Sequence, residues 1–189
     1  MTTDILELPE LRERIARYTV EVYEGMPERN ENGRRTELIR GIVIEKIPMS
    51  PLHATIAKLL YDRVMALAPS GFTVRQDHPL RLADSMPEPD LAVVVGHVRD
   101  FYDRHPHTAE LVVEIAVTTL ALDRANAALY AENGVQEYWI VIPKQQCVEV
   151  YRDPQDGAFL DRQVYAADQT VTCKGVPAIT LRISDILSP

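Results

Sequence analysis

The sequence is poor in cysteine and has no long apolar run, and both absences narrow the classes of protein that it can encode. Cys147 and Cys173 are the two cysteines, and neither belongs to a CxxC or Cys/His cluster, so the spacing that zinc sites require is missing. We expect both to be small buried residues in a reducing cytoplasm. No 18 apolar residues follow one another, and the N-terminus lacks the apolar core of a secretory signal. We therefore expect no membrane span and a cytoplasmic protein.

Positive charge is also scarce. With 20 lysines and arginines against 28 aspartates and glutamates, the formal net charge is −8. A protein that coats nucleic acid non-specifically needs a basic surface to neutralise phosphates, so the net charge argues against this class. A nuclease is not excluded, because a cleft lined by carboxylates attracts phosphate once divalent cations occupy it.

The chain has the length of one domain and an alternation of helical and strand patterns. In a chain of 189 residues, folding buries roughly 70% of the extended surface. Apolar spacing predicts an appended helix at 4–17 within an N-terminal segment 1–17, followed by one domain over 18–189. The domain is expected to be α/β with a mixed sheet. Its expected elements are a helix at 19–25, a loop at 27–35, a hairpin at 36–47, a helix at 51–68, strands at 72–82, 90–95 and 111–117, a helix at 120–133, and four shorter strands within 135–173.

Two acids in strand-like surroundings carry most of the functional information. Asp90 begins the apolar stretch DLAVVV directly after Pro-Glu-Pro, and Glu114 lies in the middle of LVVEIAV. A carboxylate in a central strand is costly to bury alone, so two of them favour a shared cation. Asp90, Glu114 and the backbone carbonyl of Ile115 could supply oxygen ligands to Mg²⁺ or Mn²⁺ if the two strands are neighbours. The alternative is that Glu114 pairs with an arginine and that Asp90 caps a strand.

Longer motifs extend this pattern over most of the chain. The matching stretches are TELIRGIVIE at 36–45, SPLHATIAKLL at 50–60, EPDLAVV at 88–94, LVVEIAVTTL at 111–120, DR at 123–124 and LYAENGVQEYWIV at 129–141. In these stretches the chain resembles the Uma-type family of restriction-endonuclease-like proteins, a branch of the PD-(D/E)XK nuclease superfamily. The likeness covers the chain from about residue 18 to its C-terminus.

The resemblance implies a restriction-endonuclease-like fold, with a mixed core sheet of four or five strands flanked by α-helices and the active site at its edge. It also implies that Asp90 and Glu114 bind the metal and that Glu37 is a further acid of the site. His53 would bind phosphate or hold Glu37 in place. From the residues alone, Glu37 could equally be a solvated hairpin residue, and His53 a cap or surface residue. The implied activity is cleavage of DNA by a homodimer.

The sequence departs from the family at one catalytic position. The family's lysine lies on the helix after the glutamate strand, where this chain has Asn126 and Ala127, and no lysine occurs between Lys58 and Lys144. Asn126 can hydrogen-bond a water but carries no charge, and Arg124 is suited to clamping a phosphate. Loss of one preorganised donor costs about 10²–10³ in rate. We therefore expect either a Mg²⁺-dependent DNA endonuclease of weak activity, or a catalytically silent nuclease-fold protein that binds nucleic acid or a protein partner.

Overall fold

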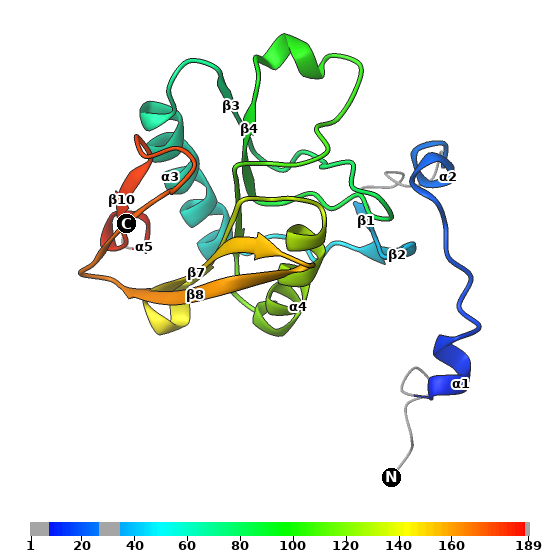
Figure 1. Cartoon of the computed structure of the whole chain (residues 1–189). Coiled ribbons are helices and arrows are strands. Elements are labelled where there is room, and N and C mark those ends of the chain that lie inside the picture. Colours follow the sequence, from blue (N-terminus) through cyan, green and yellow to red (C-terminus); the bar gives the residue numbers. More distant parts are fainter. Residues whose placement is uncertain (1–7, 27–34, 188–189) are drawn as a thin grey trace.

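The computed structural model describes residues 8–26 and 35–187, and two short helices precede its main body. These are α1 (Pro9–Arg12) and α2 (Val20–Glu24), and Figure 1 shows α1 apart from the other elements. α1 is shorter than the helix predicted at 4–17, of which residues 4–7 lie outside the described residues. α2 confirms the helix predicted at 19–25, and the Thr19 side chain caps it. All but the last residue of the loop predicted at 27–35 also lies outside the described residues.

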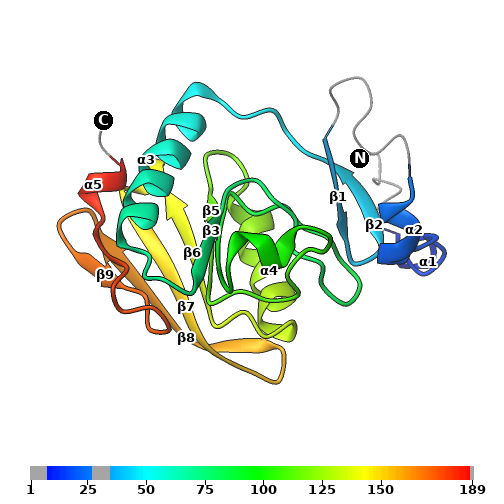
Figure 2. The same cartoon turned by 90° about the horizontal axis from the view of Figure 1, so that it is seen from above.

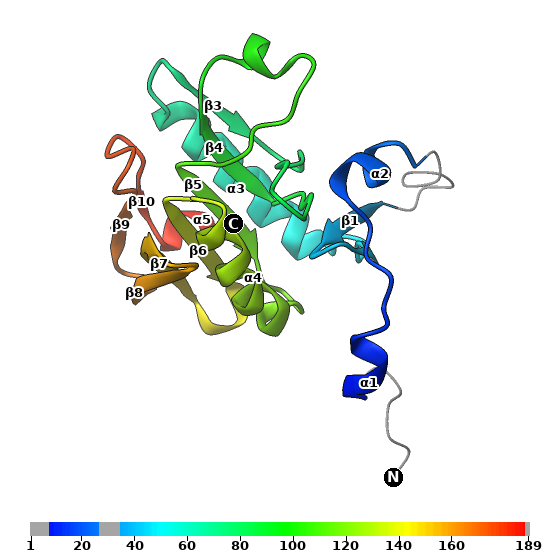
Figure 3. The ribbon, with the colours of Figure 1, turned by 45° about the vertical axis from the view of Figure 1, so that its right-hand side comes forward.

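The hairpin predicted at 36–47 is confirmed as β1 (Thr36–Ile39) and β2 (Ile42–Glu45). Arg40 and Gly41 form its two-residue turn with φ of 53° and 77°, the positive values that a tight hairpin turn requires. The hairpin forms a sheet of its own, separate from the central sheet, and Figure 3 shows it next to α2. Its small core is formed by Val20, Tyr23, Leu38 and Met86.

The central sheet has six strands, which corrects the expected number of four or five. Their order is β3-β4-β5-β6-β7-β8, and only β5 and β6 are parallel. The sheet is therefore mixed, as predicted. The strands are β3 (Phe72–Arg75), β4 (Leu91–Val95), β5 (Leu111–Ile115), β6 (Glu137–Ile142), β7 (Cys147–Gln155) and β8 (Ala158–Ala166).

Two helices cover opposite faces of this sheet, and Figure 2 shows the strands between them. α3 (Pro51–Leu67) begins at Ser50, whose side chain accepts a hydrogen bond from the His53 amide. Its buried stripe of Ile56, Leu60 and Val64 packs on one face, as the apolar spacing predicts. α4 (Leu120–Glu132) packs on the other face through Leu129 and Tyr130. Both long helices are confirmed close to their predicted bounds.

Three features of the chain differ from the expectation. The strand predicted at 72–82 ends at Arg75, because Asp77 adopts a φ of 51° that a strand cannot continue through. A short strand and a helix near the C-terminus were not predicted, β10 (Thr180–Arg182) and α5 (Ser184–Leu187). β10 pairs with β9 (Thr170–Thr172). Two 3₁₀ turns, η3 (Val98–Phe101) and η4 (Pro143–Gln145), complete the described elements.

No helix in the described part of the chain is long and apolar enough to span a bilayer.

Candidate active site

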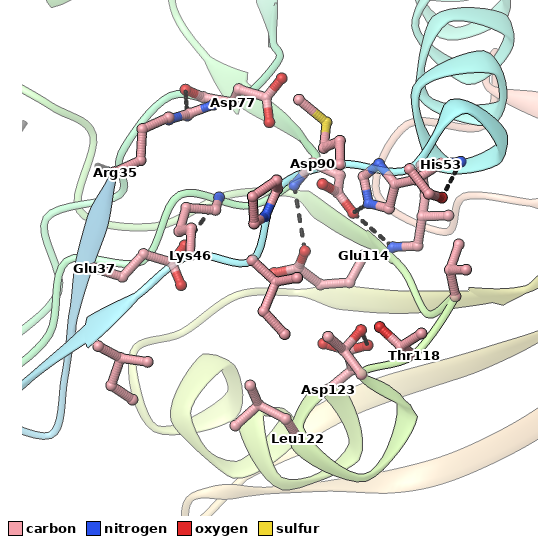
Figure 4. A pocket seen from close by; sticks show the side chains of 18 of the residues that line it. Arg35, Glu37, Lys46, His53, Asp77, Asp90, Glu114, Thr118, Leu122 and Asp123 are labelled. Atoms are coloured by element: carbon pink, nitrogen blue, oxygen red, sulfur yellow. Dashed lines mark hydrogen bonds and ion pairs between the residues drawn. The ribbon is translucent and has the colours of Figure 1, made fainter. Parts of the chain in front are cut away.

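Asp90 and Glu114 lie side by side because β4 and β5 are antiparallel neighbours. The register pairs Leu91 with Val113, which sets residue 90 across from residue 114. The amide of Asp90 donates to Glu114 Oε2 at 3.3 Å, and the amide of Ile115 donates to Asp90 Oδ2 at 2.7 Å. Figure 4 shows both carboxylates at the wall of one cavity. The neighbouring strands that the shared-cation hypothesis requires are therefore present.

Glu114 is held by a tyrosine, and no arginine contact is found for it in the described part of the chain. Its Oε1 accepts a hydrogen bond from the Tyr130 hydroxyl at 2.8 Å, and Tyr130 is fully buried on α4. Burial, followed by the neighbouring charge of Asp90, raises the pKa of Glu114 well above its ordinary value. A carboxyl in this environment favours either a proton or a cation. The arginine pair considered from the sequence is not what the structure contains.

His53 faces Asp90 from the first turn of α3. Its Nε2 lies 3.0 Å from Asp90 Oδ2, whereas its Nδ1 is buried and has no hydrogen-bond partner among the described residues. The hydrogen bond to Asp90 raises the pKa of His53, although burial opposes it. The side chain is therefore neither a helix cap nor a surface residue, and it orients Asp90 rather than Glu37.

Glu37 and Lys46 form an ion pair where the hairpin lines the cavity. Lys46 Nζ lies 3.2 Å from Glu37 Oε1, and the same oxygen accepts a hydrogen bond from the amide of Glu88 at 2.7 Å. Burial raises the pKa of Glu37, and Lys46 offsets part of this rise. Burial lowers the pKa of Lys46, but the charges of Glu37 and Glu114 outweigh it and raise the pKa overall. Lys46 is thus a cation at neutral pH.

Sequence reasoning did not single out Lys46, although strand alternation could have found it. Glu37 pairs with Ile44 across the hairpin, and the amide of Lys46 donates to the carbonyl of Arg35 at 2.8 Å, which continues the ladder. Lys46 is two positions beyond Ile44, so its side chain lies on the same face of the hairpin as that of Glu37. The two residues are diagonal neighbours.

The residues predicted on α4 are divided between the cavity and another part of the sheet. Asn126 lines the cavity. The Arg124 guanidinium binds Glu149 on β7 through two hydrogen bonds and is not among the residues described as lining the cavity. Arg124 is thus the ion-pair partner of Glu149, and its role as a phosphate clamp stays a prediction. Asp123, also in the cavity, accepts from the Thr119 hydroxyl at 2.7 Å, and burial raises its pKa to about 6.

The cavity has a volume of about 460 Å³ and is rich in acids. In the described part of the chain, no three histidine, cysteine or acidic side chains converge as a metal site, so a metal there would depend on the two adjacent carboxylates and a backbone carbonyl. Ile115 is part of the cavity wall, and its carbonyl accepts a hydrogen bond from the Val117 amide at 3.0 Å. The charged residues that line the cavity are Arg35, Glu37, Glu45, Lys46, Asp77, Asp90, Glu114 and Asp123, together with the titratable His53.

Comparison with known proteins identifies the family. The model of the Uma2 family, described as "Putative restriction endonuclease", matches residues 20–184. The chain belongs to this family. The structure is similar to the crystal structure of "a putative nuclease belonging to DUF820" from Anabaena variabilis, with a TM-score of 0.76, 19% sequence identity, and coverage of 90% of this chain and 97% of that one. No curated protein matches the chain. The predicted family and nuclease-like fold are thereby confirmed.

Proposed function

We propose that this Uma2 protein hydrolyses phosphodiester bonds of DNA in a Mg²⁺-dependent reaction at the cavity between the hairpin, α3, α4 and the β4–β5 edge. The observation that carries the proposal is the direct adjacency of Asp90 and Glu114, each hydrogen-bonded to backbone of the other strand. Membership of a family described as restriction endonucleases supports the same reaction class. Fold alone would not, because one fold can serve many activities.

The donor atoms around Asp90 fit a hard divalent cation. Asp90, Glu114 and the carbonyl of Ile115 offer oxygen only, and Mg²⁺ prefers oxygen ligands and keeps several waters. Asp90 Oδ2 binds His53 and the Ile115 amide, which leaves Oδ1 for a ligand. The two carboxyls also face each other without a guanidinium between them, so a cation would offset their repulsion. When bound, Mg²⁺ or Mn²⁺ polarises the phosphate and lowers the pKa of an attacking water.

The protein's own residues hold this arrangement in place. His53 and the Ile115 amide orient the Asp90 carboxylate, and Tyr130 orients the Glu114 carboxylate. Glu37 lies further out and holds Lys46. Asn126, in the position of the family's lysine, can hydrogen-bond a water in the cavity but cannot neutralise charge.

Cleavage of plasmid DNA with Mg²⁺ or Mn²⁺ tests the proposal. We expect nicking by the wild type and a fall of at least about 10³ in rate for Asp90→Asn and Glu114→Gln, because each removes a metal ligand while keeping side-chain size. Asp103→Asn, an exposed acid outside the cavity lining, is the matched control and should cleave normally. Nicking that survives both cavity substitutions would come from a contaminant and would refute the proposal.

A catalytically silent protein of the same fold is the second candidate, and the absence of a lysine at Asn126 and Ala127 favours it. In this account the cavity binds nucleic acid or a protein partner without cleaving. The variant Asn126→Lys separates the two candidates. Cleavage by Asn126→Lys in the absence of any by the wild type would support the silent protein, whereas cleavage by the wild type would exclude it.

The homodimer implied by the resemblance belongs to the same proposal, since two sites are convenient for cutting two strands. Light scattering on the purified protein, with and without DNA, measures this directly. A monomer under both conditions would contradict the homodimer. It would not affect the proposed hydrolysis of individual phosphodiester bonds.

A further inference from the structure

Lys46 is anchored so that its ammonium faces the carboxylate cavity. It follows β2 directly, and its amide is bonded to the carbonyl of Arg35, which fixes its backbone. Its Nζ donates to the carbonyl of Glu88 at 2.6 Å and lies 3.2 Å from Glu37 Oε1. Its side chain keeps 21% of its surface exposed, on the wall of the cavity. Figure 4 shows it between Glu37 and the Asp90–Glu114 pair.

Lys46 keeps an N–H donor beyond its two hydrogen-bonded partners, and Glu88 Oε2 lies 4.0 Å from its Nζ. An ammonium has three N–H donors, and the Glu88 carbonyl and the Glu37 carboxylate account for two. Arg35 is engaged with Glu88 Oε2 at 2.5 Å and is 41% exposed, and His53 is engaged with Asp90. Lys46 is therefore a preorganised cation that does not have to leave its partners to bind another oxygen.

We propose that Lys46 supplies from the hairpin the cation that α4 lacks, and that its third N–H contacts a non-bridging oxygen of the nucleic-acid phosphate held at Asp90 and Glu114. This inference rests on the proposed function. In hydrolysis, negative charge grows on the phosphate oxygens, and a fixed cation stabilises it without rearrangement. Glu37 is then a positioning residue, because it acts on the phosphate through Lys46.

Substitution of Lys46 tests the inference in single-turnover cleavage. We expect Lys46→Met, which keeps the length and removes the charge, to slow cleavage by about 10²–10³. Lys58→Met is the matched control, because Lys58 is an exposed lysine of α3 that pairs with Asp62 and does not line the cavity. It should cleave at the wild-type rate. A Lys46→Met protein that cleaves as fast as the wild type would overturn the inference.

A second variant separates catalysis from a structural link between the hairpin and Glu88. Asn126 lines the same cavity, so a lysine placed there can reach the phosphate from α4 but cannot rebuild the contacts to Glu37 and Glu88. We expect Lys46→Met/Asn126→Lys to recover at least tenfold of the lost rate. No recovery would mean that the loss came from the broken link, and the inference would fail.

DNA binding keeps the inference testable if the wild type does not cleave, an outcome that would refute the proposed hydrolysis by itself. With Ca²⁺ in place of Mg²⁺, fluorescence anisotropy should show weaker binding for Lys46→Met than for Lys58→Met. The slope of log affinity against log salt should fall by about 1, as expected for one lost phosphate contact. Equal affinity and slope for the two variants, or no binding by the wild type, would overturn the role of Lys46.

Discussion

Buried acids occur in two parts of the central sheet, and their partners differ. On β6 and β7, arginines hold the carboxylates. Glu137 binds Arg152 at 2.9 Å, and Glu149 binds both Arg124 and Arg162. Both acids are almost fully buried, at 0% and 2% exposed. Guanidinium partners of this kind are the usual way to bury a carboxylate.

In the cavity, the carboxylates have no such partners. Asp90 is 8% exposed, yet a histidine and a backbone amide hold it, and Glu114 is held by a tyrosine and a backbone amide. These neighbours orient the two acids, which lie side by side at the cavity wall. Burial and the charge of Asp90 disfavour ionisation of Glu114.

The pKa values follow this difference. Burial alone would raise the pKa of Glu149, but hydrogen bonds from Arg124, Tyr151 and Arg162 outweigh it and lower the pKa to about 2. In the cavity, burial raises the pKa of Asp123 to about 6 and that of Glu114 well above its ordinary value. Glu149 therefore stabilises the fold, whereas the ionised forms of Glu114 and Asp123 destabilise it. This contrast indicates a functional cavity rather than a structural one.

The largest expected effect is a difference in stability between two substitutions, one of an arginine-paired acid and one of an acid in the cavity. Glu149→Gln should lower the free energy of unfolding at pH 7 by about 3 kcal/mol, because it removes a carboxylate whose pKa the fold depresses. Glu114→Gln should leave the stability of the metal-free protein unchanged or raise it by up to about 2 kcal/mol. Urea unfolding followed by circular dichroism measures both. Equal destabilisation by the two substitutions would contradict the division into structural and functional acids.

The contrast also explains how far the sequence could predict the site. Asp90 and Glu114 were predictable because each lies in or beside a continuously apolar strand, where an unpaired carboxylate is conspicuous. The hairpin was predictable from Arg40-Gly41 between two β-branched segments. In both cases the signal lies in the residues that directly flank the position in the chain.

Contacts between distant segments could not be predicted. Arg124 has its partner Glu149 25 residues away, and Lys46 reaches the carbonyl of Glu88 across 42 residues. Whether Arg124 faces a phosphate or a strand depends on how α4 packs on β7, and sequence spacing does not specify this. The early end of β3 depends on the backbone at Asp77, and its one local signal in the sequence is Pro79, two residues further along.

A divalent cation should raise the free energy of unfolding by binding at the cavity acids and not at the acids of β6 and β7. At a Mg²⁺ or Mn²⁺ concentration 100-fold above Kd, the free energy of unfolding of the wild type should rise by about 2.7 kcal/mol. Glu114→Gln should lose most of this gain, and Asp103→Asn should keep it. Urea titrations with and without the cation provide the measurement. An equal gain in Glu114→Gln would indicate binding elsewhere on the acidic surface.

The smallest effect concerns Asp123 and depends on pH. Its pKa is raised from 3.8 to about 6 in the folded protein, so the stability that its protonated form contributes is complete below about pH 3.8 and is lost as the pH rises through 6. Asp123→Asn cannot ionise and keeps an oxygen that can accept from Thr119. The variant should therefore be more stable than the wild type by about 1–3 kcal/mol at pH 7.5.

This advantage of Asp123→Asn should shrink towards zero as the pH falls from 7 to 4, because other groups titrate alike in both proteins and cancel in the difference. Urea midpoints measured across that range, without divalent cations, supply the curve. A difference that does not vary with pH would show that Asp123 ionises as a solvated acid does. Burial and the neighbouring charges of Asp90 and Glu37 would then not disfavour the ionised form of Asp123 as expected.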